Sequence, residues 1–255
     1  MAAYDLLGNI VLVKFPPRTG KTAKLTFARR FLRERTSVRT VLEKVEGFSG
    51  RLRTQTTRFL AGERTTEALY RENGCEFRFN VDTCYFSPRL AAERAAVARF
   101  VKRREKVLVL FGGVGPFAIV LAKTKKPARV VCVELGRVPS TYALENVKRN
   151  RVAVEVVQGD VRRVLPKMKE TFGRIVMARP NLEDDFLDVV FGRVAKGGMI
   201  HYYGFYHESE VAKLGELIER RAREARRKIR ILKVVRAGDI GPGWFRYRAD
   251  VKVET

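Results

Sequence analysis

The chain has 255 residues, 45% of them hydrophobic, so it can bury one substantial core and leave room for a smaller second unit. Lys and Arg number 52 against 28 Asp and Glu, and a net charge of +24 points to a polyanionic partner, with nucleic acid as the leading candidate. No run approaches the roughly 20 apolar residues of a membrane-spanning helix. Asp5 and Gly8 interrupt the short apolar stretch at the beginning of the sequence, so we expect no signal peptide.

The first part of the chain predicts a small α/β unit over residues 1–47. Its expected elements are a strand at 10–13, a turn at 16–20, a basic helix at 23–35 and a second strand at 38–45. Three short strands should follow at 51–60, 68–70 and 76–81, and then a helix at 88–102 that opens with proline. This organisation separates an N-terminal unit from a larger domain at 48–255.

Strands and helices alternate from residue 106 onward. We expect strands at 107–111, 129–134, 152–157, 174–178 and 199–203, with helices at 115–123, 139–150 and 183–195 between them. Strands this apolar, separated by helices, predict a parallel sheet that is covered on both faces. The tail adds a helix at 208–227 and strands at 229–235 and 244–253, without a two-residue turn to define their pairing. The predicted fold is α/β, with a mixed, mostly parallel Rossmann-like sheet.

The cysteines provide little chemistry. Cys75, Cys84 and Cys132 are scattered without C-x-x-C spacing, which argues against a disulfide framework and against a structural zinc site. We therefore expect no bound metal and a reduced, cytoplasmic location.

A glycine turn follows the first strand of the predicted parallel sheet, at Gly112, Gly113 and Gly115. Glycines let the backbone turn sharply and let a ligand approach the N-terminus of the next helix. Glu134 ends the next strand, where a carboxylate can accept from two ribose hydroxyls, and Asp160 follows the third, where an acid can accept from an adenine amino group. Together they predict a nucleoside site, whereas the glycines alone also fit a dinucleotide site or a plain tight turn.

Motifs along nearly the whole chain resemble the archaeal and eukaryotic tRNA (guanine-37-N1)-methyltransferases, the Trm-five family. They are YDLLGNIV at 4–11, GRLR at 50–53, LAGE at 60–63, ENG at 72–74, DTCYFSPRLAAER at 82–94, FGGVGPF at 111–117 and GGMIHYY at 197–203. The resemblance implies a class I methyltransferase domain that uses S-adenosylmethionine. It also implies tRNA, through its anticodon stem-loop, as the partner. Fuller members carry a further N-terminal domain, so the chain resembles a short form, which we expect to be a monomer.

The resemblance also implies roles for single residues. Glu93 matches the proposed general base that takes the proton from guanine N1, and Arg53 matches an arginine that would stabilise negative charge on O6. In the cofactor site, Phe111 would join the glycines, Glu134 and Asp160. The target base would contact three matched residues: Tyr85, Arg89 and Pro180. Ala178 departs from the family, which has an asparagine there.

Other functions stay open. The related wybutosine enzyme, which transfers an aminocarboxypropyl group from the same cofactor, is similar in the strand at 200–202. Methylation of a wyosine precursor at the same tRNA position is within reach of the family. A non-catalytic RNA-binding protein on this scaffold is a third alternative. A nicotinamide-dependent dehydrogenase fits the high positive charge poorly.

Overall fold

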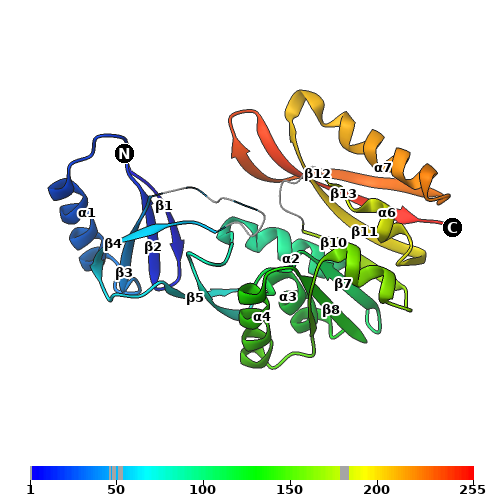
Figure 1. Ribbon diagram of the computed structural model, residues 1–255, viewed down its shortest axis with the longest axis horizontal. Coiled ribbons are helices and arrows are strands. Elements are labelled where there is room, and N and C mark those ends of the chain that lie inside the picture. The colour runs from blue at the N-terminus through cyan, green and yellow to red at the C-terminus, as the bar shows by residue number, and fades with distance from the viewer. Residues whose placement is uncertain (1, 46, 48–49, 51–53, 179–183) are drawn as a thin grey trace.

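The computed structural model describes residues 2–45, 47, 50, 54–178 and 184–255, which form an N-terminal unit beside a larger α/β domain (Figure 1). In this part of the chain no helix is both long and apolar enough to span a bilayer. The N-terminal unit lies at one end of the molecule, and the last two strands lie at the other (Figure 1).

Four strands and one helix make up the N-terminal unit. They are β1 (Ala3–Leu7), β2 (Ile10–Lys14), α1 (Lys21–Glu34), β3 (Thr40–Lys44) and β4 (Thr57–Gly62). The sheet has the order β1-β2-β3-β4, with β2 parallel to β3 and the other pairs antiparallel. Because β4 pairs with β3, this sheet includes residues up to Gly62, which lies beyond the boundary expected at residue 47.

The two faces of this small sheet have different partners, because successive side chains of a strand point to opposite sides. Val11 and Val13 pack against Phe31 of α1, which covers the outer face (Figure 1). Ile10 and Leu12 face the other way and share a hydrophobic core with the larger domain. The N-terminal unit is therefore packed onto its neighbour.

A hairpin connects the two parts. It consists of β5 (Glu67–Glu72) and β6 (Cys75–Asn80), and Asn9 binds it through Glu67 O at 3.2 Å and Leu69 N at 2.6 Å. On the other side, Asn146 and Asn150 hydrogen-bond the backbone of β6 at 2.7–3.0 Å. The hairpin is thus attached to both units through backbone contacts.

The larger domain contains a seven-stranded sheet in the order β12-β13-β11-β10-β7-β8-β9. Its strands are β7 (Lys106–Leu110), β8 (Arg129–Glu134), β9 (Glu155–Gln158), β10 (Phe172–Met177), β11 (Val194–His207), β12 (Ile229–Gly241) and β13 (Trp244–Val253). The five strands from β7 to β11 run parallel to one another. Strand β13 runs antiparallel to both β11 and β12. The predicted mixed, mostly parallel sheet is confirmed.

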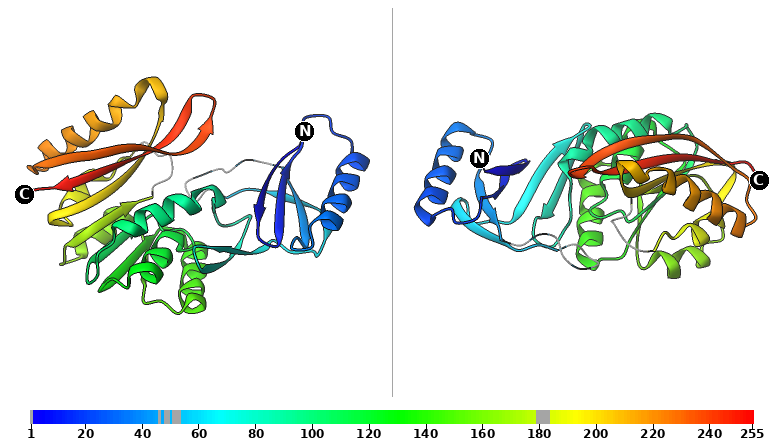
Figure 2. Two further views of the ribbon diagram at one scale, coloured as in Figure 1. Left: turned by 180° about the vertical axis from the view of Figure 1, so that it is seen from behind. Right: turned by 90° about the horizontal axis from the view of Figure 1, so that it is seen from above.

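Helices cover both faces of this sheet (Figure 2). They are η1 (Pro88–Leu90), α2 (Ala91–Phe100), α3 (Pro116–Lys125), α4 (Arg137–Asn150), α5 (Val161–Val164), η2 (Leu165–Lys167), α6 (Leu187–Phe191), η3 (Glu208–Glu210) and α7 (Ala212–Glu224). Val107 and Val109 of β7 lie in one core with Ile119 of α3, whereas Leu108 lies in another with Leu214 of α7. Alternation along buried strands therefore divides the helices into two layers.

Two expectations for the C-terminal half are wrong in extent. The helix expected at 183–195 is only Leu187–Phe191, and β11 already begins at Val194 and runs on to His207. The strands expected at 229–235 and 244–253 are joined by a two-residue turn, because β12 continues to Gly241. The sequence RAGDIG at 236–241 has low strand propensity, and it pairs through irregularities in register.

A buried ion pair supports the start of α2 and provides a stability test. The side chains of Arg94 and Glu72 are 2% and 3% exposed, and Arg94 also donates to Ser87 O at 3.0 Å. Glu72→Gln should lower the free energy of unfolding by about 3–5 kcal/mol in urea denaturation, because it leaves a buried guanidinium without a counter-charge. The control Glu76→Gln breaks more exposed pairs and should cost less than about 1 kcal/mol. Equal losses would contradict this role for the buried pair.

Candidate functional site

A pocket opens at the carboxyl ends of β7, β8, β9 and β10, the edge at which open α/β sheets bind ligands. It is lined by residues from both cores and from the turns after these strands. These are Tyr85, Phe86, Ser87, Leu90, Arg94, Phe111, Gly112, Gly113, Pro116, Phe117, Val133, Glu134, Leu135, Pro139, Asp160, Val161, Ala178, Phe186, Tyr203 and Arg246.

The glycine turn brings the backbone close to one wall of the pocket. A Cβ on Gly112 would lie 2.2 Å from Cys132 Sγ, so a side chain does not fit there unless the buried Cys132 side chain moves. Gly113 has a φ of +55°, which favours glycine. Gly115 has a φ of +89° and is the N-cap residue of α3; a Cβ there would lie 3.0 Å from Ile119 Cδ1, behind the pocket wall. The turn therefore presents Gly112 and Gly113 to the pocket, while Gly115 shapes the turn.

Glu134 holds this turn in place. Its Oε2 accepts from the backbone N–H of Gly113 and its Oε1 from that of Gly136, both at 2.8 Å. Burial raises the pKa of the Glu134 carboxyl above its usual value, although the backbone donors oppose the shift. Each carboxylate oxygen can accept more than one hydrogen bond, so the group can still receive hydroxyl donors from a ligand in the pocket.

Asp160 and Phe111 complete this side of the pocket. Asp160 caps α5, and its Oδ1 accepts from the N–H of Arg162 at 2.8 Å. Phe111 directly follows β7 and packs edge-to-face against Phe186, with the ring centroids 5.0 Å apart. The pocket thus brings together Phe111, Gly112, Gly113, Glu134 and Asp160, five of the six residues predicted for the cofactor.

The residues predicted for the target base are divided. Tyr85 lines the pocket, and its hydroxyl accepts from Arg246 at 3.4 Å. Arg89 is exposed, turns away from the pocket and donates to Asp5 Oδ1 of β1 at 2.8 Å. Arg53 and Pro180 lie outside the described residues, and the neighbouring Ala178 lines the pocket.

Glu93 lies on the first turn of α2, behind the pocket wall. Its Oε1 accepts from the Tyr203 hydroxyl at 2.7 Å and from Arg248 Nη1. Tyr203 is itself a lining residue, so the carboxylate is hydrogen-bonded to a residue of the pocket wall. Burial, together with the Glu93 charge, holds the pKa of Tyr203 well above its usual value, and its hydroxyl therefore stays protonated.

A series of buried polar groups continues from Glu93 into the domain. Arg248 binds Asp250 through two hydrogen bonds of 2.7 and 3.1 Å, and Asp250 Oδ1 lies 2.6 Å from His201 Nδ1. His201 Nε2 lies 2.6 Å from Arg174 Nη1. An arginine can only donate, so Nε2 accepts and Nδ1–H donates to Asp250. Burial lowers the pKa of His201, in keeping with this neutral tautomer.

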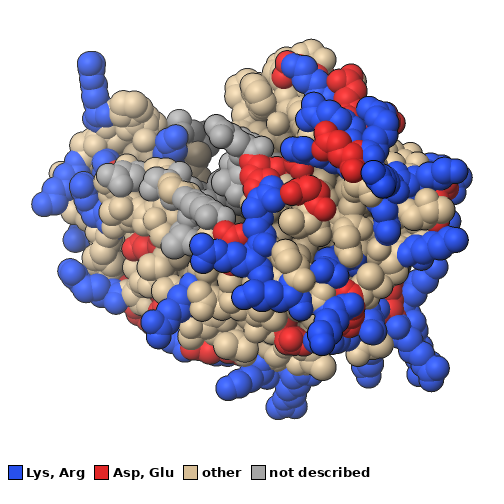
Figure 3. Space-filling model, turned by 45° about the vertical axis from the view of Figure 1, so that its right-hand side comes forward, with Lys and Arg blue, Asp and Glu red and all other residues tan. Residues whose placement is uncertain are grey.

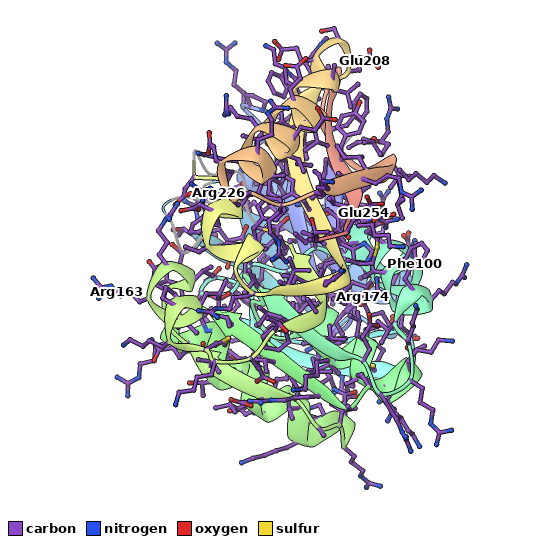
Figure 4. The ribbon with its side chains drawn as sticks, turned by 90° about the vertical axis from the view of Figure 1, so that its right-hand side faces the viewer. Phe100, Arg163, Arg174, Glu208, Arg226 and Glu254 are labelled. Carbon is purple, nitrogen blue, oxygen red and sulfur yellow. The ribbon has the colours of Figure 1, made fainter. Side chains whose placement is uncertain are left out.

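Arg174, near the beginning of β10, ends this series. It donates to Phe100 O, at the end of α2, at 2.6 Å and to Glu105 Oε2 at 3.1 Å, and Figure 4 labels Phe100 and Arg174. The whole series from Glu93 to Glu105 contains three carboxylates, two guanidiniums and a neutral imidazole. It therefore carries one negative charge in excess.

Sequence reasoning missed Tyr203, Arg246 and Arg248. Arg246, Arg248 and Asp250 stand at every second position of β13, a strand that was correctly expected. Charged residues at this spacing on a buried strand share one face and need partners there. That pattern was the available signal, but the partners come from β11 and α2, which are distant in sequence.

Comparisons with known proteins identify relatives of this chain in sequence and in structure. The family model described as "TRM5/TYW2 methyltransferase domain" matches residues 68–232. The chain is 35% identical to the tRNA (guanine(37)-N(1))-methyltransferase Trm5b of Pyrococcus abyssi, over 82% of this chain and 61% of that protein. It is 28% identical to the tRNA (guanine(37)-N(1))/4-demethylwyosine(37)-methyltransferase Taw22 of Nanoarchaeum equitans, over 98% and 99%. The crystal structure of wild-type Trm5b from Pyrococcus abyssi superposes with a TM-score of 0.88 at 31% identity, covering 99% of this chain and 75% of that one.

The position of Glu134 predicts a pH dependence of ligand binding. As pH falls through its raised pKa, the carboxyl becomes protonated and loses acceptor capacity for ribose hydroxyls. Calorimetry between about pH 8 and pH 5 should therefore show weakening affinity for S-adenosylhomocysteine at a pH above the ordinary glutamate range. The Glu134→Gln variant should bind S-adenosylhomocysteine more weakly than the wild type near pH 8, and its affinity should change little as the pH falls. A wild-type affinity that is flat over the same interval, together with an unaltered affinity in Glu134→Gln, would remove Glu134 from the binding site.

Proposed function

Because the chain belongs to the TRM5/TYW2 methyltransferase family, we propose that it methylates N1 of guanine 37 in tRNA with S-adenosylmethionine, acting as a monomer in the cytoplasm. One observation carries the proposal: a single pocket joins the glycine turn and Glu134 on one side to the Tyr203–Glu93 pair on the other. The first arrangement suits an adenosyl group, and the second suits removal of a proton.

The residues near the glycine turn fit S-adenosylmethionine. A Cβ at Gly112 would clash with the Cys132 side chain, so only glycine fits there as the structure stands, which suits a turn that keeps its backbone close to a bound nucleoside. Glu134 would accept from the ribose hydroxyls, and Asp160 from the adenine amino group. The apolar side chains of Phe111 and Phe186 would shield the adenine from water. When bound, S-adenosylmethionine supplies an electrophilic methyl group.

Glu93 is the proposed acceptor of the guanine N1 proton. Since Tyr203 lies on the wall and Glu93 behind it, the N1 proton would pass to the Tyr203 oxygen while the Tyr203 proton moves to Glu93. Tyr203 ends the step as it began, and Glu93 becomes neutral. This transfer also removes the excess negative charge of the buried series, while Arg248 keeps the carboxylate oriented beforehand.

The remaining roles concern the base and the RNA. Tyr85 would offer an aromatic face to a base taken out of its stack, and Arg53 would stabilise the charge that develops on O6. Lys and Arg side chains project over much of the face in Figure 3, which suits the phosphates of tRNA. The basic helix α1 adds exposed charges at Arg29, Arg30 and Arg33.

A wyosine precursor at position 37 is the second candidate substrate. The Nanoarchaeum equitans relative, whose name includes 4-demethylwyosine, aligns over nearly the full length of both chains. Ala178 at the pocket wall has a small apolar side chain, which leaves more room for a tricyclic base than an asparagine would. Both substrates use the same cofactor and the same position in tRNA.

Product mapping tests the proposed function. The protein is incubated with labelled S-adenosylmethionine and an unmodified tRNA transcript that carries guanine 37, and the nucleosides are then identified by mass. We expect 1-methylguanosine at position 37 and no product on a matched transcript with adenine 37. An aminocarboxypropyl adduct, or no turnover on guanine-37 or demethylwyosine-37 tRNA, would refute methyl transfer to this position.

The proton path gives a second test. Glu93→Gln should keep cofactor binding but lower the single-turnover rate by roughly 10²–10⁴-fold, the usual contribution of a positioned acid or base. Tyr203→Phe should also lower the rate, because it removes the hydroxyl that connects Glu93 to the pocket. The control Tyr142→Phe also deletes a tyrosine-to-glutamate hydrogen bond, that with Glu67 away from the pocket, and should leave the rate unchanged. Full activity in Glu93→Gln would place the base elsewhere.

A further inference from the structure

The paired strands β11 and β13 carry a continuous row of functional side chains. Directly opposite residues are His201 and Asp250, Tyr203 and Arg248, Phe205 and Arg246, and His207 and Trp244. Because side chains alternate along a strand, these four pairs project from the same face of the sheet. The inner two pairs belong to the buried series that ends at Glu93. The outer two pairs have no part in the proton path.

Exposure is higher at the outer end of this row than at its inner end. His201 and Arg248 are 1% and 4% exposed, whereas Trp244 is 45% exposed. Arg246 lies between them and lines the pocket. Figure 4 shows the same direction, with Glu208 beyond the outer end of β11 and Arg174 near its inner end. The row therefore leads from the domain interior past the pocket to solvent.

The outermost pair presents an aromatic surface of defined orientation. The Trp244 and His207 rings meet edge-to-face, with centroids 5.9 Å apart and planes at 72°. His207 packs on Gly243, where a Cβ would lie 2.4 Å from Nε2, and its Nδ1 lies 2.7 Å from Ser209 Oγ. These contacts hold His207, and His207 in turn supports one edge of the half-exposed indole.

The next pair places a cation beside this surface. The Arg246 guanidinium lies over the Phe205 ring at 5.0 Å, and its Nη2 donates to Tyr85. Trp244 and Arg246 are two residues apart on a strand, about 6.8 Å, a stride comparable to that between neighbouring nucleotides in an unstacked strand. An aromatic face and a guanidinium in this order match a base and the adjoining phosphate.

We propose that Trp244 and Arg246 form a binding subsite for the nucleotide next to the one that enters the pocket. Trp244 stacks on the neighbouring base, and Arg246 contacts the phosphate between the two nucleotides. The subsite rests on the proposed function, since it takes its position from the target base in the same pocket. A base that leaves the loop exposes the face of its neighbour, and the indole replaces that lost stacking contact.

The protein supplies its own probe, because Trp244 is the sole tryptophan of the chain. Tryptophan emission is followed while the full chain is titrated with an anticodon stem-loop RNA that carries unmodified guanine 37. We expect quenching that saturates with binding, which is measured separately by anisotropy of an end-labelled RNA. An abasic nucleotide at either position 36 or position 38 is then introduced, and quenching should be lost for one of the two.

Variants complete the test. Trp244→Leu should weaken stem-loop binding roughly 10-fold, within the usual range for loss of one stacked base, while Trp244→Phe should retain most of the affinity. Affinity for S-adenosylhomocysteine should stay unchanged in both. Leu232→Ala, which alters another half-exposed apolar residue, on β12, should bind RNA and quench as the wild type does.

The outcomes separate this subsite from the proposed methyl transfer. Methylation of the stem-loop without quenching, or quenching that survives both abasic substitutions, would overturn the subsite and leave the enzyme intact. Quenching that is lost at one neighbour without methylation would uphold the subsite and refute the reaction. Unaltered RNA affinity in Trp244→Leu would assign the exposed ring to another partner, such as a protein, and would also overturn it.

Discussion

The guanidinium of Arg248 lies in the interior of the sheet between the carboxylates of Glu93 and Asp250. A charge buried at this depth is tolerated only with close partners, and each partner then needs its own. Asp250 is therefore paired with His201, and His201 with Arg174. Arg174 in turn binds Glu105 and the backbone of α2 at Phe100. Strands β10, β11 and β13 are therefore held in one register by polar contacts as well as by their backbone ladder. The proposed proton acceptor stands at one end of this series.

The opposite wall of the pocket follows a different constraint. There the backbone itself forms the surface, and Glu134 bridges the turns after β7 and β8 through Gly113 and Gly136. One buried carboxylate thus shapes the turn and remains as an acceptor for a ligand. The pocket combines a backbone wall with a wall of aromatic side chains and arginines that includes Tyr85, Tyr203 and Arg246, and such a division suits a cofactor on one side and a reacting base on the other.

The sequence was sufficient for the sheet and for the backbone wall, because both depend on local patterns. Apolar strands at regular spacing, glycines after the first strand, and acids at the next two strand ends are visible one element at a time. The partners of Glu93 could not be found in this way, because Tyr203 and Arg248 come from strands that only tertiary pairing brings to α2. Arg89 matched a motif, yet its side chain turns to Asp5 on β1, a contact that depends on how the two units pack. The extent of β12 was underestimated for a similar reason, since pairing with β13 overrides the weak strand propensity of 236–241.

The core shared by the N-terminal unit and the larger domain has a geometric consequence. Ile10 and Leu12 pack in the same hydrophobic cluster as Phe77 and Val109, and the hairpin β5–β6 is bound from both sides. This packing places the helix α1 at a defined distance from the pocket. An RNA whose backbone contacts α1 while its displaced base enters the pocket would have to match this distance.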